Sequence, residues 1–336
     1  MKALVTGGGG FLGGAIVRML RERGDDVRSF ARGAYPALQE AGVEVHRGDL
    51  ADATAVARAV EGMDVVFHVA ALPGVWGPYA EYHRANVTGT ENVLEACRAH
   101  AVRRLVFTST PSVVLSGRDI EGGDESLPYA TTFSSHYART KAVAERMVLA
   151  ANGASLSTVA LRPHLVWGPG DNHLIPRIVA RGRTGRLRLI GDRAKLVDTV
   201  YVDNAADAHL AAADRLAPEA PCAGKAYFIS NDEPLPLAEI TNGILAAAGL
   251  PPVTKRIPVS VAIALGGLAE VVYGGLRIRR EPPLTRFVAH QLSTAHWFDI
   301  SAARRDLGYE PRVSIEEGLR RLAASFATEG AGTASS

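Results

Sequence analysis

The chain contains few lysines and cysteines and no block of basic residues. Lysine occurs at only five of 336 positions (2, 141, 195, 225 and 255), so arginine carries almost all of the positive charge. Because the formal net charge is only +2 and the basic residues are scattered, we expect no binding to nucleic acid. The two cysteines, Cys97 and Cys222, form no C-x-x-C or Cys/His metal pattern. We therefore expect reduced thiols, no metal site and a cytoplasmic protein.

The first half of the chain alternates short apolar segments with amphipathic ones and shows no internal repeat. From the composition of the first residues we expect no signal peptide. The predicted strands are 2–6, 26–32, 43–48, 65–70, 104–109 and 157–162, and the predicted helices are 12–23, 53–60, 79–99 and 135–151. Strands that alternate with helices favour right-handed β-α-β units and a parallel sheet that helices cover on both faces.

We therefore predict an α/β doubly wound fold over residues 1–165, which forms a nucleotide-binding domain. Residues 166–329 are expected to form a smaller, mainly substrate-binding part, some segments of which return to the first domain. The Gly/Ala/Ser-rich tail, residues 330–336, is expected to be disordered.

Residues 257–276 form a nearly apolar segment that precedes three arginines, Arg277, Arg279 and Arg280. Its length of 20 residues suffices to span a membrane, but Glu270, a proline and four glycines argue against a span. A buried or amphipathic helix near a substrate entrance is the favoured prediction. Contact with a membrane surface is the first alternative.

The segment TGGGGFLGG places a dense group of glycines between a predicted strand and a predicted helix. Its pattern, Gly7-x-x-Gly10-x-x-Gly13, is typical of a dinucleotide-binding loop. We expect Gly7 to permit a tight turn and Gly10 to let the backbone approach a pyrophosphate. Gly13 is expected to permit close packing of the helix on the strand. No role is predicted for the other glycines of the segment.

The residues after the next strands indicate which dinucleotide binds. An acidic residue at the end of the second strand usually holds the ribose of NAD, but residues 29–33 contain no acid. Arg32 follows Gly13 by 19 residues and can pair with a 2′-phosphate, which favours NADP(H); a solvated surface arginine is the alternative. Asp49 is a candidate for contact with adenine or an ordinary helix cap. Ala70, in the segment HVAA, is small enough to let the backbone approach a cofactor.

Tyr137 and Lys141 lie four residues apart, so both project from one face of the helix predicted at 135–151. An ammonium group beside a phenol stabilises the phenolate and lowers the pKa of the phenol toward neutral pH. The pair is therefore suited to general acid/base chemistry. Ser109 and Thr110 follow the fifth strand, where a hydroxyl can bind a substrate carbonyl or simply form a turn.

These motifs together resemble the extended short-chain dehydrogenase/reductase family, in its branch similar to 3β-hydroxysteroid dehydrogenases. The resemblance rests on TGGGGFLGG, HVAA, FTSTPSV, YARTK and RPHLVWGPGD, and it extends through YVDNAADAHL to GYEPRVSIEEGL. It implies a Rossmann fold with Tyr137 as the catalytic acid/base and Lys141 as its partner. It also implies that Thr110, or less well Ser109, binds the substrate oxygen. Asn86 occupies a position near the lysine.

The resemblance further implies a set of cofactor-binding positions that are spread over the first half of the chain. They are Gly7, Gly10, Phe11, Leu12, Gly13, Arg32, Asp49, Leu50, Ala70, Tyr137, Lys141 and Pro163.

Four further segments are similar to reductases of this branch in bacterial long-chain olefin biosynthesis: RGDLADATAV, YHRANVTGTENVLEACRAH, YFISNDEPLP and EPPLTRF. The similarity implies NADPH-dependent reduction of a 2-alkyl-3-oxo acid to the 2-alkyl-3-hydroxy acid. It also implies a homodimer that assembles with other enzymes of that pathway. Trp167 and residues 257–276 are then candidates to line a channel for two alkyl chains. Arg177 or Arg286 is a candidate to bind the carboxylate of the substrate.

Three other functions would use the same motifs. A sterol or another hydrophobic ketone is the principal alternative substrate. A sugar-nucleotide epimerase is disfavoured because such enzymes retain NAD⁺ and need a polar cleft. A non-catalytic NADP(H) sensor is disfavoured because Tyr137 and Lys141 are both present.

Overall fold

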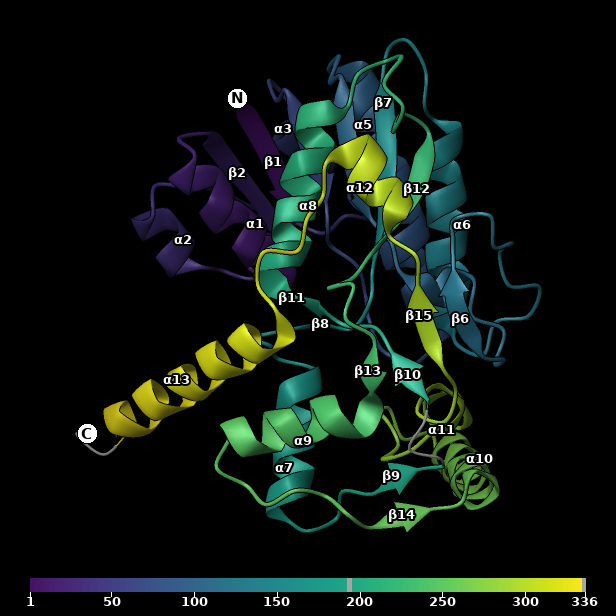
Figure 1. The fold of residues 1–336 in the computed structure, drawn as a ribbon. Helices are drawn as coiled ribbons and strands as arrows, with labels where there is room; N and C mark the ends of the chain where they lie inside the picture. Colours follow the sequence, from purple (N-terminus) through teal and green to yellow (C-terminus); the bar gives the residue numbers. More distant parts are fainter. Residues whose placement is uncertain (192–194, 334–336) are drawn as a thin grey trace.

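A parallel sheet of seven strands forms the centre of the computed structural model, which describes residues 1–191 and 195–333 (Figure 1). The strand order is β12-β7-β5-β4-β1-β2-β3, and all neighbouring strands are parallel. The order reverses between β1 and β4, which is the topological switch point of a doubly wound sheet. The predicted α/β Rossmann fold is confirmed. The strands are β1 (Lys2–Thr6), β2 (Asp26–Ala31), β3 (Glu44–Arg47), β4 (Val65–His68), β5 (Arg104–Thr108), β7 (Ser157–Pro163) and β12 (Lys225–Ile229).

Helices cover both faces of this sheet because successive strand residues point to opposite faces. Ala3 and Val5 of β1 lie in one apolar cluster, whereas Leu4 lies in another. The first cluster includes α1 (Phe11–Glu22), α8 (Val202–Arg215) and α12 (Ser301–Leu307); the second includes α3 (Ala53–Val60), α5 (Gly89–Ala99) and part of α6 (His136–Ala150). The short helix α2 (Pro36–Glu40) follows β2. Because α8, β12 and α12 come from the second half of the chain, that half contributes directly to the sheet and its cover.

The helix predicted over 79–99 is continuous, but it contains a π-helical segment. It consists of α4 (Tyr79–Tyr82), η1 (His83–Thr88) and α5. Asn86 of η1 accepts a hydrogen bond from the Leu72 backbone N–H (2.7 Å) and donates to the Leu72 carbonyl oxygen (3.2 Å). It also donates to Thr140 Oγ1 of α6 (3.1 Å). The wider π turn, a feature that often marks functional sites, thus fixes the segment after β4 against α6.

The remaining elements form a smaller part beside the carboxyl ends of the sheet strands (Figure 1). Its helices are α7 (Leu174–Arg183), α9 (Leu237–Ala247), α10 (Val259–Gly275), α11 (Arg286–Gln291) and α13 (Ile315–Thr333). A small sheet contains β13 (Leu235–Pro236), β10 (Leu196–Val197), β15 (His296–Phe298) and β6 (Ile120–Gly123); β8 (Val166–Trp167) pairs with β11 (Val200–Tyr201), and β9 (Leu189–Ile190) with β14 (Arg256–Ile257). A 3-10 turn, η2 (Pro111–Val113), follows β5.

Two segments differ from the sequence prediction. The apolar residues 257–276, predicted as a buried or amphipathic helix, form α10, of which only Ala262 and Gly266 are buried. Gly266 packs against the start of α11, and Val259 and Ile263 are half-buried against a small apolar cluster, but most of the larger side chains stay at the surface. The tail predicted to be disordered continues α13 through Thr333, because each residue added to a formed helix gains a hydrogen bond. Positions 334–336 lie outside the described residues.

Within residues 1–191 and 195–333, no helix combines the length and the hydropathy needed to cross a bilayer.

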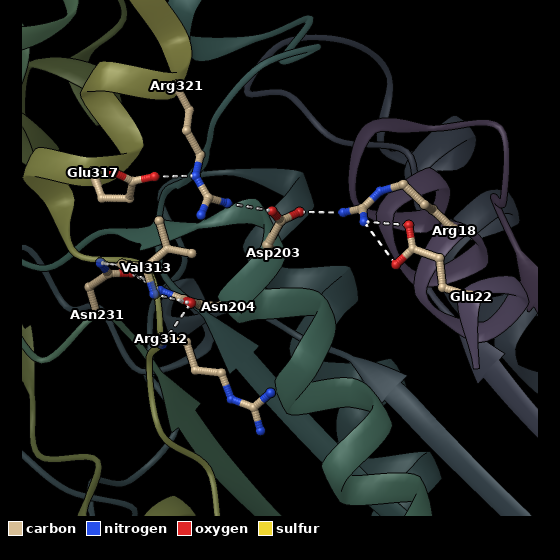
Figure 2. A network of polar contacts seen from close by, with 9 residues as sticks. All are labelled: Arg18, Glu22, Asp203, Asn204, Asn231, Arg312, Val313, Glu317 and Arg321. Carbon is tan, nitrogen blue, oxygen red and sulfur yellow. Dashed lines mark hydrogen bonds and ion pairs between the residues drawn. The ribbon is translucent and has the colours of Figure 1, made fainter.

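Charged side chains at the start of α8 connect three helices that lie far apart in the sequence (Figure 2). Asp203 accepts hydrogen bonds from Arg18 of α1 (2.6 Å) and from Arg321 of α13 (3.4 Å). Arg321 also donates to Glu317 on its own helix (2.6 Å). Exposed ion pairs contribute little to the free energy of unfolding. We therefore infer that this network mainly orients the start of α13 relative to α1 and α8.

Asn204, the next residue of α8, has a buried side chain that holds the segment before α13. It accepts hydrogen bonds from the Arg312 and Val313 backbone N–H groups (3.0 Å each) and donates to the Val313 carbonyl oxygen (2.8 Å). Asn204→Ala leaves these groups unpaired, so we expect the free energy of unfolding to fall by about 2–4 kcal/mol. Urea denaturation measures the loss. Asn172→Ala, at an exposed position, is the control, and equal stability of the two variants would contradict this role.

Candidate active site

A cleft of about 750 Å³ opens at the carboxyl ends of β1, β2 and β4. It brings together ten of the predicted cofactor positions: Gly7, Gly10, Phe11, Leu12, Gly13, Arg32, Asp49, Leu50, Ala70 and Tyr137. Two others, Lys141 and Pro163, are buried and are not part of its lining. The cleft also contains residues that the sequence analysis missed, namely Tyr35, Leu72, Pro73, Arg84 and His173. The signal for these residues was their place after strands of the parallel sheet: Tyr35 follows β2, and Leu72 and Pro73 follow β4.

The glycine loop is held by backbone contacts that leave no room for side chains. Gly7 has φ +73°, and a Cβ there would lie 3.0 Å from Ala70 Cα. A Cβ on Gly13 would lie 2.1 Å from the Gly7 carbonyl oxygen. That oxygen also accepts a hydrogen bond from the Gly10 N–H (2.8 Å). Gly10 is the N-cap of α1 and caps it with no side chain, so the positive end of the helix faces the cleft through backbone alone.

Gly9, for which the sequence predicted no role, lies against the ring of Tyr35. A Cβ on Gly9 would approach three ring carbons of Tyr35 to 2.3–2.4 Å. A Cβ on Gly33 would lie 3.0 Å from Tyr35 Cζ. The ring therefore packs on two glycines, one from the loop before α1 and one from the segment after β2. Gly9 is needed to admit this side chain, a requirement that the local sequence pattern does not reveal.

Arginines surround the part of the cleft where β2 and β3 end. Arg32 is exposed at the end of β2. Asp49 accepts a hydrogen bond from the Ala51 N–H (3.0 Å) and forms an ion pair with Arg84 (2.9 Å). The Ala51 hydrogen bond and the two arginines lower the pKa of Asp49 below its usual value, although partial burial opposes the shift. Asp49 is therefore ionised at neutral pH, as an acceptor for an amino group must be.

Lys141 is fully buried beneath the cleft and holds its ammonium group against the end of β5. Its Nζ donates to the Thr108 carbonyl oxygen (2.7 Å) and lies 3.9 Å from the centre of the Phe107 ring. Burial lowers the pKa of Lys141 to about 7, although Glu145, one turn further along α6, opposes the shift. Glu145 itself is paired with buried Arg162 (2.6 Å). Lys141 can therefore exchange a proton near neutral pH.

The pKa of Tyr137 differs in direction from the sequence prediction. Lys141 was expected to lower it, but burial of the phenol raises it to about 12, and only contact with Thr110 acts against the shift. The reason is that both groups of the pair lie in a site of low polarity, where charge on either one is disfavoured. Tyr137 is consequently protonated at neutral pH, which suits a proton donor.

The two candidate hydroxyls after β5 have different surroundings. Thr110 caps the turn η2, where its Oγ1 accepts from the Ser112 N–H (3.2 Å), and it is the hydroxyl that interacts with Tyr137. Ser109 Oγ is buried and makes no hydrogen bond within the described residues. The contact with the phenol favours Thr110 over Ser109 for the predicted role.

A second cavity of about 280 Å³ lies next to the cleft. Two segments of the chain contribute to both the cleft and the cavity. In the first, Leu72 and Pro73 line the cleft, and Gly74 and Val75 line the cavity. In the second, His173 lines the cleft and Leu174 lines the cavity. The cavity wall is mainly apolar and comes from α7, α9 and α11. Its apolar residues include Leu174, Ile178, Ile190, Leu237, Ile240, Ile244, Val288 and Leu292.

Only some of the residues predicted to contact the substrate line this cavity. Arg177 lines it, but both of its terminal nitrogens donate to Glu281 (2.8 and 3.0 Å). Arg286 lies outside the cavity lining and donates to Glu270 (2.6 Å). Trp167 is fully buried in a packed cluster and donates to Thr199 Oγ1 (3.1 Å), so it lines no channel. These partners lie far away in the sequence, so the pairing was not visible there.

Comparison with known proteins identifies the family. The model of the 3-beta hydroxysteroid dehydrogenase/isomerase family matches residues 4–259. The chain belongs to this family. A 2-alkyl-3-oxoalkanoate reductase of Stenotrophomonas maltophilia is 59% identical over 97% of this chain and 100% of the relative. One of Shewanella oneidensis is 54% identical over 96% of this chain and 86% of the relative. Among solved structures, MoeE5 in complex with UDP-glucose and NAD is 27% identical, with TM-score 0.74 over 98% and 99% of the two chains.

As a member of the 3-beta hydroxysteroid dehydrogenase/isomerase family, the protein is an oxidoreductase that acts on a hydroxyl or carbonyl group. The matched segment contains the whole cleft, from the glycine loop to Tyr137 and Lys141. It ends at Val259, where α10 begins. The family match therefore covers the chemical centre, whereas α10 and the elements after it lie beyond the matched segment.

The contact between Gly9 and Tyr35 is tested by adding one methyl group. Gly9→Ala would place a Cβ inside the Tyr35 ring, so we expect the affinity for the dinucleotide to fall about tenfold or more as the ring is displaced into the cleft. Gly14→Ala is the matched control, because its Cβ meets only an ordinary contact at 3.6 Å. Titration with the dinucleotide by intrinsic fluorescence measures both. If Gly9→Ala binds as well as Gly14→Ala, the ring does not depend on Gly9.

Proposed function

We propose that this protein reduces 2-alkyl-3-oxoalkanoates to 2-alkyl-3-hydroxyalkanoates with a nicotinamide dinucleotide, in the biosynthesis of long-chain olefins. The observation that carries the proposal is the position of Tyr137 in a glycine-lined cleft that adjoins an apolar cavity. Two relatives that are more than half identical over nearly the whole chain bear the name of this reductase. A cleft for the dinucleotide beside an apolar pocket suits a substrate whose ketone reacts in the cleft and whose alkyl part lies in the pocket.

The cleft fits a dinucleotide because Gly7, Gly10 and Gly13 line it and form a cradle of bare backbone. Gly7 and Gly13 have no space for a side chain, and α1 directs its N-terminus toward the cradle. The pyrophosphate would therefore lie on this loop, with adenine toward Asp49 and Leu50. MoeE5, which shares the fold, binds NAD. We assign NADP(H) to this chain because Arg32 stands where NAD-dependent enzymes place an acid. When bound, the cofactor supplies the hydride for the carbonyl carbon.

The chain's own residues would donate the proton to the substrate oxygen and stabilise the negative charge that develops on it. Thr110 and Tyr137 would donate hydrogen bonds to the ketone oxygen, and Tyr137 would transfer its phenolic proton to that oxygen as negative charge develops there. The raised pKa of Tyr137 keeps this proton in place before the reaction. Lys141, with its pKa near 7, stabilises the phenolate left behind and returns a proton to it.

The apolar cavity supports the choice of a substrate with alkyl chains. Its lining from α7 and α9 offers a dry surface for one chain. Arg181 and Arg188 also line the cavity, and they replace Arg177 as candidates for the carboxylate, because Arg177 is held by Glu281. A homodimer through α5 and α6 remains part of the proposal, together with assembly with the neighbouring enzymes of the pathway.

A sterol or another hydrophobic ketone is the second candidate substrate, and the family match favours it over the remaining alternatives. The same cavity would hold a rigid ring system instead of a flexible chain. Parallel assays with a 2-alkyl-3-oxo acid, a 3-oxosteroid and a UDP-sugar separate these functions. Turnover of the 2-alkyl-3-oxo acid at least tenfold above the others is expected; a preference for the steroid would overturn the proposal.

Tyr137→Phe removes the proton donor and preserves the ring. We expect kcat to fall by at least about 100-fold, because general acid catalysis contributes that much, while the affinity for NADPH stays within about twofold. Stopped-flow absorbance at the NADPH band measures turnover, and fluorescence titration measures binding. Tyr273→Phe, a half-buried tyrosine outside the cleft, is the control. Retained reduction by Tyr137→Phe would exclude the mechanism.

Arg32→Ala removes the side chain that we assign to the 2′-phosphate. We expect the KM for NADPH to rise by about tenfold or more and the KM for NADH to change by less than about twofold, since a charge-assisted contact is lost only with the phosphate-bearing cofactor. Steady-state kinetics with both cofactors make the comparison. Arg47→Ala, at an exposed position of β3, controls for loss of positive charge. An equal effect on both cofactors would remove Arg32 from this role.

A further inference from the structure

The helix α10 exposes a continuous apolar face to solvent. Among the described residues, the large hydrophobic side chains of high exposure all lie between positions 261 and 278. They are Val261, Leu265, Leu268, Val271, Val272, Leu276 and Ile278. Positions 261, 265, 268, 272 and 276 follow the three-to-four-residue spacing of one helix face. Leu268 is 61% exposed and Val271 72% exposed, which is unusual for side chains of this size within a contiguous patch.

The opposite face of α10 already has its partner within the chain. Gly266 lies so close to α11 that a Cβ on it would be 2.6 Å from the Thr285 carbonyl carbon. Glu270 accepts hydrogen bonds from the Arg286 backbone and side chain (2.8 and 2.6 Å). This face carries the small residues and the neutralised acid of the helix. The exposed apolar face is therefore not left over from poor packing, because the helix is anchored firmly on its other side.

Positive charge follows the apolar face directly. Arg277, Arg279 and Arg280 are exposed at the end of α10, and residues 271–280 contain no acid. The flanking acids are engaged elsewhere: Glu270 by Arg286, and Glu281 by Arg177 (2.8 Å). Arg279 forms a long ion pair with Glu81 (4.0 Å), whereas no ion pair of Arg277 or Arg280 is found within the described residues. The surface thus combines apolar side chains with two cations that no acid neutralises. In a two-fold dimer that packs α10 against α10, a second copy of the chain would bring its own Arg277 and Arg280 to the same patch, which disfavours that occupant.

The patch also borders the apolar cavity. Trp76 donates a hydrogen bond to the Ile278 carbonyl oxygen (3.0 Å) and contacts the ring of Tyr273 edge-on, with centroids 6.4 Å apart. Its neighbour Val75 lines the cavity. On the other side, α11 packs on α10 and contributes Val288 and Leu292 to the cavity wall. The exposed face of α10 therefore lies beside the elements that enclose the cavity.

We infer that α10 is an interfacial helix that docks the protein on an anionic phospholipid surface. Leu265, Leu268 and Val271 enter the boundary between headgroups and acyl chains, while Arg277 and Arg280 pair with lipid phosphates. Docking brings the wall of the apolar cavity next to the bilayer, where an acid with two long alkyl chains partitions. This benefit rests on the proposed function, but the docking itself does not.

The experiment is vesicle flotation of the full chain. Wild type should float with phosphatidylcholine vesicles that contain phosphatidylglycerol, and its partition should be at least about tenfold weaker with phosphatidylcholine alone. Leu268→Ser combined with Val271→Ser should reduce flotation about tenfold or more, because apolar burial is lost. Arg277→Gln combined with Arg280→Gln should weaken binding to the anionic vesicles and flatten its dependence on salt.

Arg47→Gln combined with Arg58→Gln, two exposed positions outside α10 and outside the proposed dimer helices, should float like wild type. Sedimentation velocity of each variant provides the second measurement. Failure of wild type to float with any vesicle would overturn the inference, as would equal flotation of all variants. A concentration-dependent oligomer that the Leu268→Ser/Val271→Ser variant dissociates would identify a second copy as the occupant and would also overturn it.

Reductase activity with a short-chain, water-soluble 3-oxo acid separates this inference from the proposed function. The α10 variants should retain that activity within about twofold, because they lie outside the cleft and are exposed. Flotation without reductase activity in wild type would overturn the proposed function and leave docking intact. Reductase activity of wild type without flotation would overturn the docking inference and leave the proposed function intact.

Discussion

The contact of Gly13 with the Gly7 carbonyl oxygen is the constraint on which the rest of the site depends. A Cβ at position 13 would lie 2.1 Å from that oxygen, so α1 can start this close to β1 only without a side chain there. The same loop presses Gly7 against Ala70 at the end of β4. Three backbone segments thereby meet at the switch point of the sheet, and the cleft is the space that remains between them.

Burial then determines the chemistry of the groups around this cleft. Lys141 is enclosed between α6 and β5, and its pKa falls to about 7. The phenol of Tyr137 is affected in the opposite sense, because burial favours the neutral form of either group. One environment therefore yields a protonated donor beside an amine that exchanges a proton at neutral pH. Glu145, in a buried ion pair with Arg162, acts against the shift at Lys141.

The second half of the chain adapts this centre to an apolar substrate. It returns α8, β12 and α12 to the sheet and places α7, α9 and α11 around a cavity beside the cleft. It also leaves α10 exposed at the edge of that cavity. Large apolar residues of α7 and α9 face the cavity, whereas most of the large apolar residues of α10 face solvent. A hydrophobic substrate and a lipid surface both require apolar side chains that are accessible in this region.

The sequence by itself indicated the sheet, the helices around it and the candidate pair Tyr137 and Lys141, because these depend on local periodicity and on short spacings such as Gly7 to Gly13 and Tyr137 to Lys141. Only the tertiary structure decided how distant groups meet. It placed the Tyr35 ring on Gly9, paired Arg177 with Glu281, buried Trp167 and reversed the expected pKa shift of Tyr137. Packing partners and burial arise from segments far apart in the chain, so no local pattern records them.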